Sequence, residues 1–190
     1  MIAVVPAAGR SERFGSSKLT ADVGGAPMLE RTIRSLLDGG LPRVIVVIAP
    51  DAELDAVPSL RDRRVRTAVN SDPALGMFSS VQAGIAAARA RDTIVLLPGD
   101  MPFVHAQTVA RVVARAKKAP GAIVLPTCGG KHGHPIAIPH TLRDAILSAG
   151  ADQTLKDVLA AANTTTRIEI DVDDTGVLRD VDTVQDLRSA

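Results

Sequence analysis

The stretch VVPAAGRSERFGSSKL (residues 4–19) joins a short apolar run to a loop rich in glycine, serine and basic side chains. The loop carries two glycines and three cations, Arg10, Arg13 and Lys18. Glycine lets a backbone approach a phosphate closely, and arginine and lysine neutralise its charge, so the loop favours a polyanion. Its spacing matches neither the P-loop nor the three-glycine dinucleotide fingerprint. For such a loop taken alone, a solvated surface loop is the commoner case, and the rest of the chain decides.

The composition is that of an ordinary globular protein. The 190 residues are 46% apolar and 23% charged, which suits one α/β domain spanning residues 1–190. The formal net charge of +1 gives no general attraction to nucleic acid or membranes, and 2% aromatic residues leave little for base stacking. We therefore expect neither nucleic acid nor a membrane as a partner.

The cysteine content and the opening residues indicate a cytoplasmic protein. Cys128 is the only cysteine, which excludes an internal disulfide and fits a reducing compartment. The opening MIAVVPAAG is too short for a signal-peptide core, and no later apolar run approaches the length of a membrane span.

Short β-branched runs alternate along the chain with stretches of helical period, as around residues 29–37 and 109–116. This alternation, with nearly continuous apolar strands, predicts an α/β fold with one doubly wound, mostly parallel sheet. In such sheets ligands bind beyond the carboxyl ends of the strands, which points to the segments after Pro6, Val69 and Pro98. The runs are IAVVP (2–6), RVIVVIAP (43–50), VRTAVN (65–70), DTIVLLPGD (92–100), AIVLPT (122–127), PIAIP (135–139) and TRIEID (166–171).

One carboxylate follows an otherwise apolar strand. In LLPGDMPFV, Asp100 is either a helix N-cap or a metal ligand. A phosphate-binding loop on a neighbouring strand favours Mg²⁺, which typically takes one or two carboxylates together with substrate phosphate oxygens. A second carboxylate is then expected, and LRDVDTVQDL offers Asp180, Asp182 and Asp186. Asp182 or Thr183 could instead simply cap a closing helix.

Two further segments carry polar side chains next to glycines. NSDPALGMFSSVQAGI (70–85) is read as a strand end, a turn and a helix start, where Ser79 and Ser80 either meet an anion or only cap the helix. PTCGGKHGHPIAI (126–138) is read as a glycine-rich hairpin whose Lys131 and histidines face an anionic group, with a plain tight turn as the alternative.

Six stretches together resemble the MobA-like nucleotidyltransferases, and among them the molybdenum cofactor cytidylyltransferases. The resemblance spans nearly the whole chain, in order. The stretches are AAGRSERFGSSKL (7–19), GMFSSVQAG (76–84), LPGDMPFV (97–104), PTCGGKHGHPIAI (126–138), GADQTLKDVL (150–159) and DVDTVQDL (180–187).

The resemblance implies a nucleotide-diphospho-sugar transferase fold and a set of site residues. The implied catalytic residues are Arg13, Lys18 and Asp100, and the implied Mg²⁺ ligands are Asp100 and Asp182, with Asp180 as the alternative to Asp182. The implied nucleotide-binding residues are Ala7, Ala8, Gly9, Arg10, Ser11, Asn70, Gly76, Met77 and Ser80. The implied acceptor-binding residues are Lys131, His132, Gly133 and His134.

The resemblance also implies an activity. The enzyme would move NMP from an NTP onto a phosphorylated acceptor and release pyrophosphate. The AAG at the start of the first motif favours CTP as the donor, and the favoured acceptor is molybdopterin. A molybdoenzyme or its chaperone would be a transient partner. The alternatives are a sugar- or polyol-phosphate acceptor, GTP as donor, and a non-catalytic nucleotide-binding regulator. VVPAAG is also how the methylerythritol phosphate cytidylyltransferases begin, which keeps that acceptor open.

Overall fold

The computed structural model describes residues 1–9, 18–183, 185 and 186. It contains an eight-stranded sheet with the order β3-β2-β1-β4-β7-β5-β6, in which β8 also pairs with β5. The strands are β1 (Ile2–Ala7), β2 (Val44–Ile48), β3 (Val65–Val69), β4 (Ile94–Leu96), β5 (Ile123–Cys128), β6 (Lys131–His132), β7 (Ile136–Ile138) and β8 (Arg167–Asp171).

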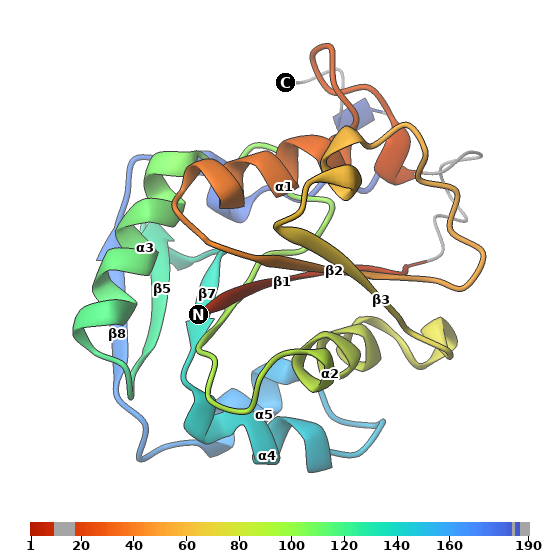
Figure 1. Ribbon diagram of the computed structural model, residues 1–190. Helices are drawn as coiled ribbons and strands as arrows, with labels where there is room; N and C mark the ends of the chain where they lie inside the picture. The colour runs from red at the N-terminus through yellow and green to blue at the C-terminus, as the bar shows by residue number, and fades with distance from the viewer. Residues whose placement is uncertain (10–17, 184, 187–190) are drawn as a thin grey trace.

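Helices cover both faces of the sheet, with α1 and α3 on one side and α2, α4 and α5 on the other (Figure 1). The α-helices are α1 (Met28–Asp38), α2 (Met77–Ala87), α3 (Ala106–Lys118), α4 (Arg143–Ser148) and α5 (Leu155–Ala161). Short 3-10 helices span Lys18–Thr20, Pro58–Arg61, Pro73–Leu75, His140–Leu142 and Thr175–Leu178. Within the described ranges, no helix has both the length and the apolar character needed to cross a membrane.

The pairing confirms the predicted mostly parallel sheet. β1 pairs in parallel with β2 on one side and with β4 on the other, and β2 pairs in parallel with β3. The exceptions are β6 and β7, which run antiparallel to their neighbours. They follow the Gly129–Gly130 turn, where both residues have positive φ and the chain reverses direction beside β5.

Each face of the sheet has its own apolar core, because strands buried on both sides alternate their side chains between two helical layers. Val5 and Leu36 pack in the layer under α1 and α3, while Val4 and Ile85 pack in the layer over α2. All four side chains are fully buried. These two layers fix the positions of the strand ends from which the site is built.

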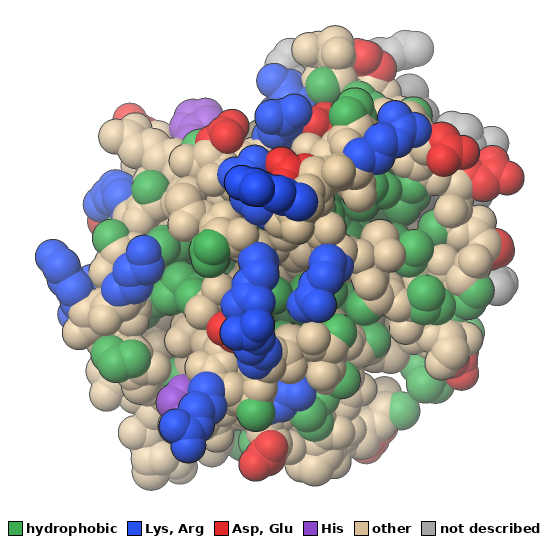
Figure 2. Space-filling view, viewed as in Figure 1, with side chains coloured by type: hydrophobic (Ala, Val, Ile, Leu, Met, Phe, Trp, Pro, Cys, Tyr) green, Lys and Arg blue, Asp and Glu red, His purple; other side chains and the backbone are tan. Residues whose placement is uncertain are grey.

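Arginines lie before several strands, at the amino-terminal edge of the sheet, where Asp62 pairs with Arg64 and Asp92 with Arg43. Arg43 precedes β2, Arg64 precedes β3 and Arg91 lies shortly before β4. In the space-filling view, Lys and Arg side chains gather in the middle of the face shown (Figure 2). Because basic side chains gather at this edge too, positive charge alone does not locate a ligand-binding site in this protein.

Candidate active site

The site lies where the carboxyl ends of β1 and β4 meet. The strand order reverses at this point, since β2 and β3 lie on one side of β1 and β4 on the other. Such switch points are where open α/β sheets bind ligands. Just beyond β1, Ala8 is buried and Gly9 is exposed. The predicted nucleotide ligands Arg10, Ser11 and Arg13 lie outside the described residues.

Lys18 joins two carboxylates that are far apart in the sequence. Its Nζ donates to Asp100 Oδ2 at 2.9 Å and to Asp182 Oδ1 at 2.8 Å. The Lys18 side chain is 12% exposed and that of Asp182 is 62% exposed, so the cluster opens to solvent on the Asp182 side. Burial alone lowers the pKa of Lys18, but its hydrogen bonds with Asp182 and Asp100 more than offset this, and the pKa is raised above its ordinary value. The lysine therefore keeps its positive charge.

Asp100 is placed by a close approach between β1 and the segment after β4. The amide of Gly99 donates to the carbonyl of Pro6 at 3.0 Å. A Cβ at Gly99 would lie 3.2 Å from Pro6 O and 3.2 Å from Cβ of Ala7, so glycine allows the two segments to come this close. Asp100 does not cap α3, whose N-cap is His105. The cap alternative for Asp100 is therefore wrong.

The second carboxylate comes from the segment after β8, which we call the C-terminal strap (residues 172–183). The amide of Val181 donates to the carbonyl of Asp100 at 3.0 Å. The Val181 side chain is fully buried and packs with Met28 at the start of α1. These contacts hold Asp182, the next residue, beside Asp100.

Thr183 and Asp186 hydrogen-bond to one another, while the helix that the sequence predicts there lies partly outside the described residues. Thr183 N and Oγ1 donate to Asp186 Oδ2 at 2.7 and 2.8 Å, and Asp186 N donates back to Thr183 Oγ1 at 3.3 Å. Asp182 gives only its backbone amide to that carboxylate, at 3.0 Å. Its own carboxylate accepts from Lys18. Asp180 is exposed and acts through its charge on His134.

A buried carboxylate that the sequence analysis did not single out holds the strap. Asp174 is 3% exposed. Its Oδ2 accepts from the amide of His105 at 3.0 Å and from Thr108 Oγ1 at 2.6 Å, and its Oδ1 accepts from the amide of Gly176 at 3.0 Å. Asp174 thus ties the strap to the first turn of α3. The only signal in the sequence is an ordinary Asp-x-Gly turn pattern, which occurs in many surface loops.

Asn70 organises the segment between β3 and α2. Its Nδ2 donates to Ser79 Oγ at 2.8 Å and to Ser80 Oγ at 3.0 Å, and its Oδ1 accepts from the amide of Asp72 at 3.1 Å. Asn70 and Ser80 are both buried. The N-cap of α2 is Gly76, with no side-chain cap, so the serines bind Asn70 and do not cap the helix.

The turn before α2 exposes apolar side chains. Gly76 has φ +87°, a conformation that favours glycine, and Met77 directly after it is 60% exposed. Val69 and Leu75 are exposed nearby in sequence, while Phe78 is buried. Phe78 therefore packs in the interior, whereas Met77 faces solvent.

The Gly-His-Pro segment divides into an exposed and a buried part. His132 Nε2 lies 2.8 Å from Glu169 Oε1 on β8, a strand separated from β4 by β7 and β5. Lys131 is also exposed. A Cβ at Gly133 would lie 2.5 Å from the carbonyl oxygen of Val177 in the strap, so this position has no room for a side chain.

His134 is half-buried and contacts β4 and the strap. Its Nδ1 lies 3.4 Å from the carbonyl oxygen of Leu96, and its amide donates to the carbonyl of Val177 at 2.9 Å. Burial lowers the pKa of His134 despite the opposing charges of Asp100 and Asp180. The structure thus brings Lys18, Asp100, Asp182 and His134 into one neighbourhood, whereas His132 pairs with Glu169.

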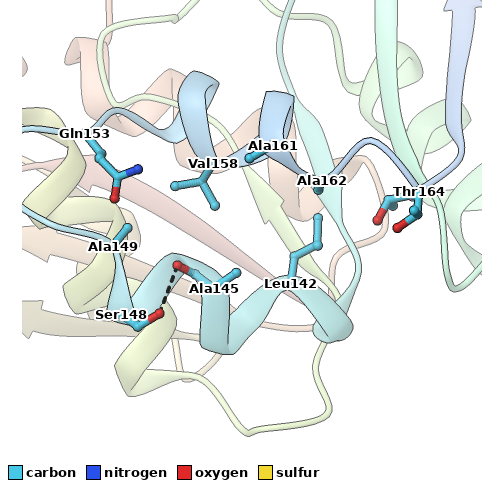
Figure 3. Close-up of a pocket in the computed structure, with 10 residues that line it drawn as sticks. Leu142, Ala145, Ser148, Ala149, Gln153, Val158, Ala161, Ala162 and Thr164 are labelled. Carbon is cyan, nitrogen blue, oxygen red and sulfur yellow. Dashed lines mark hydrogen bonds between the residues drawn. The ribbon is translucent and has the colours of Figure 1, made fainter.

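A separate groove of about 400 Å³ lies between α4 and α5 (Figure 3). Val158 points into it from α5 and Leu142 from the 3-10 helix just before α4, and Gln153 lies at one end. Its lining has no charged side chain and no histidine or cysteine. It therefore lacks the groups that phosphate or metal chemistry needs.

Comparison with known proteins places the chain in a family. The model of the MobA-like NTP transferase domain matches residues 3–166. The chain is 31% identical over 166 residues to a probable molybdenum cofactor guanylyltransferase of Haloferax mediterranei, covering 83% of this chain and 75% of that protein. It is 31% identical over 126 residues to a 2-C-methyl-D-erythritol 4-phosphate cytidylyltransferase of Rhodococcus opacus, covering 65% of this chain and 54% of that protein. A third relative, nicotine blue oxidoreductase of Paenarthrobacter nicotinovorans, is 29% identical over 193 residues, which is 97% of this chain and 93% of that protein.

Solved structures share the fold over nearly the whole chain. A nucleotidyl transferase from Methanothermobacter superposes with a TM-score of 0.82 at 22% identity, covering 99% of this chain and 94% of that one. A Mycobacterium tuberculosis protein solved in complex with manganese superposes with a TM-score of 0.68 at 21% identity, covering 99% and 96%. Given the match of the family model over residues 3–166, the chain belongs to the MobA-like NTP transferase family.

Proposed function

We propose that this protein is a Mg²⁺-dependent nucleotidyltransferase that moves CMP from CTP onto the phosphate of molybdopterin and releases pyrophosphate. The observation that carries the proposal is the convergence of Lys18, Asp100 and Asp182 at the carboxyl ends of β1 and β4. A permanently charged ammonium next to two carboxylates suits a site that must hold both a triphosphate and a divalent cation.

The carboxylates fit the cation that the family implies. Asp100 and Asp182 come from distant parts of the chain, yet both hydrogen-bond to the same ammonium, so the fold already gathers two hard oxygen ligands around one positive charge. Mg²⁺ prefers such oxygen ligands and completes its shell with water and phosphate oxygens. When bound, the ion would neutralise charge that develops on the transferring phosphate.

The residues of the chain would position the substrates and neutralise their phosphate charge, and they need not remove a proton. An ionised phosphate oxygen of the acceptor attacks the α-phosphorus in line, the bond from that phosphorus to the bridging oxygen of the β-phosphate breaks, and pyrophosphate leaves with the electron pair. Because the nucleophile is already an anion, no general base is required. Lys18 would neutralise phosphate charge, together with Arg13 and the backbone of Ala8 and Gly9.

The nucleoside would lie over the segment between β3 and α2. Asn70 and Ser80 hold one another in place, and Gly76 with the exposed Met77 presents backbone and an apolar surface. The choice of CTP rests on the AAG sequence at residues 7–9. GTP is the alternative donor.

The acceptor would approach from the hairpin that holds Lys131, His132, Gly133 and His134. Of these four residues, His134 contacts the carbonyl oxygen of Leu96 at the end of β4, the strand that precedes Asp100. The surface position of Lys131 allows it to bind an anionic group. Sugar phosphates and polyol phosphates, including methylerythritol phosphate, are the alternative acceptors.

The proposal is tested by pyrophosphate release from each of the four NTPs with Mg²⁺ and molybdopterin. We expect release with CTP, and a loss of about 10³-fold or more in Asp100→Ala, because the substitution removes preorganised charge stabilisation. Asp144→Ala, which removes an exposed carboxylate on α4, is the matched control and should keep wild-type turnover.

The other outcomes each change one part of the proposal. Release with GTP alone reassigns the donor, and release only with methylerythritol phosphate reassigns the acceptor. Release from no combination contradicts the transferase activity. Wild-type turnover in Asp100→Ala contradicts the site.

A further inference from the structure

Lys18 occupies the place between the two carboxylates that a divalent cation would need. Its Nζ lies 2.9 Å from Asp100 Oδ2 and 2.8 Å from Asp182 Oδ1. A Mg²⁺ ion binds oxygen at about 2.0–2.1 Å and repels an ammonium held at the same two oxygens. Lysine and cation therefore compete for Asp100 and Asp182.

Lys18 has the means to leave. It lies at the first position of the short helix Lys18–Thr20, and its long side chain ends in a single charged group with three donors. Asp182 is the more exposed partner, so water and ions reach the cluster from that side. What the ammonium lacks without a nucleotide is another anion to bind, and a triphosphate supplies one.

We propose that Lys18 is a displaceable internal counter-ion, which holds Asp100 and Asp182 together in the nucleotide-free protein and gives them up to the divalent cation as it moves to the triphosphate. The inference rests on the proposed function for the identity of its two ligands. It adds that the free protein binds the cation weakly, and that the lysine itself couples cation binding to nucleotide binding.

The experiment is Mn²⁺ binding to the nucleotide-free protein, followed by the EPR signal of free Mn²⁺. We expect Lys18→Met to bind Mn²⁺ about tenfold or more tightly than wild type, because two charge-assisted hydrogen bonds no longer have to break. Lys18→Arg, which keeps a cation at this position, should bind as weakly as wild type. Lys117→Met, an exposed lysine of α3, controls for the general loss of one positive charge.

Two further variants tie the effect to the cluster. Adding Asp182→Asn to Lys18→Met should return Mn²⁺ binding to the weak wild-type level. If Lys18→Met does not fold by circular dichroism, Lys18→Gln replaces it. Mn²⁺ affinity in the folded variant equal to or below that of wild type would overturn the proposal, as would the same gain in Lys117→Met.

The two proposals can fail separately. Pyrophosphate release by wild type together with unchanged Mn²⁺ affinity in Lys18→Met refutes the exchange and leaves the transferase intact. Tighter Mn²⁺ binding in Lys18→Met without pyrophosphate release from any NTP supports the competition between Lys18 and the cation and refutes the transferase.

Discussion

Replacing Asp174 with alanine should both destabilise the protein and weaken its hold on a divalent cation. The Asp174 carboxylate accepts three hydrogen bonds, from His105 N, Thr108 Oγ1 and Gly176 N, at 3.0, 2.6 and 3.0 Å. At 3% exposure, water cannot replace the lost acceptor without opening the strap. The strap also carries Asp182, so a loss at Asp174 reaches the site.

The magnitude follows from those three bonds. A hydrogen bond to a charged group contributes roughly 1.5–3 kcal/mol, and deleting a buried charged partner typically costs about 3–5 kcal/mol in all. We therefore expect Asp174→Ala to lower the free energy of unfolding by about 4 kcal/mol, which for a chain of this size lowers Tm by about 8–16 °C. Asp174→Asn keeps one acceptor oxygen and should lose about 1–2 kcal/mol.

The assay is urea unfolding followed by circular dichroism, with Mn²⁺ affinity measured on the folded protein. Asp173→Ala removes the neighbouring exposed carboxylate and should stay within about 0.5 kcal/mol of wild type. Equal stability of Asp174→Ala and Asp173→Ala would refute the bracing role. A destabilised Asp174→Ala with unchanged Mn²⁺ affinity would show that Asp182 is positioned without it.

Two further substitutions test the packing around α1 and α2. Glu30 is buried and accepts from Ser59 N at 2.7 Å, so Glu30→Ala should lower the free energy of unfolding by about 2–4 kcal/mol in urea. The control Arg34→Ala removes an exposed guanidinium that pairs with Glu30 and should lower it by less than about 1 kcal/mol. Burial raises the pKa of Glu30, but hydrogen bonds from Arg34 and Ser59 lower it more. The stabilisation by the Glu30 carboxylate is therefore present above the unfolded-state pKa and is lost as pH falls through the lower folded-state pKa. A difference in unfolding free energy between wild type and Glu30→Gln that stays constant through this acid range would contradict the prediction. Gly84→Ala should lower stability by about 1–3 kcal/mol, because its Cβ would overlap Val4 Cγ1 and lie 2.9 Å from Val47 Cγ2. Gly121→Ala meets nothing within 4 Å and should be neutral in thermal unfolding.

The strands were predictable from the sequence because each strand is a local run of apolar residues. The apolar runs around Val46 and Val95 form buried parallel strands, and the resemblance predicts Asp100 and Asp182, which both hydrogen-bond to Lys18. The antiparallel direction of β7 was not predicted, since two strands a few residues apart look alike whichever way they run.

The contacts of the site depended on distances that no local pattern carries. His132 and Glu169 are 37 positions apart, so nothing in the glycine-rich hairpin indicated that the histidine would turn to β8. Asn70 and its two serines lie within one segment, but a serine at the start of a helix usually caps that helix. Here both serine hydroxyls accept from the side-chain amide of Asn70 instead. Asp174 is one of several aspartates near the end of the chain, and only packing separates it from Asp173.

The position of Asp182 after the strands has a consequence for translation. Among the described residues the last strand, β8, ends at Asp171, and the match to the family model ends at residue 166, yet one of the two clustered carboxylates follows both. A ribosome therefore delivers that carboxylate after the described strands. A chain cut between β8 and Asp182 would keep these strands and lose half of the acidic pair, so it should hold a divalent cation more weakly than the uncut chain.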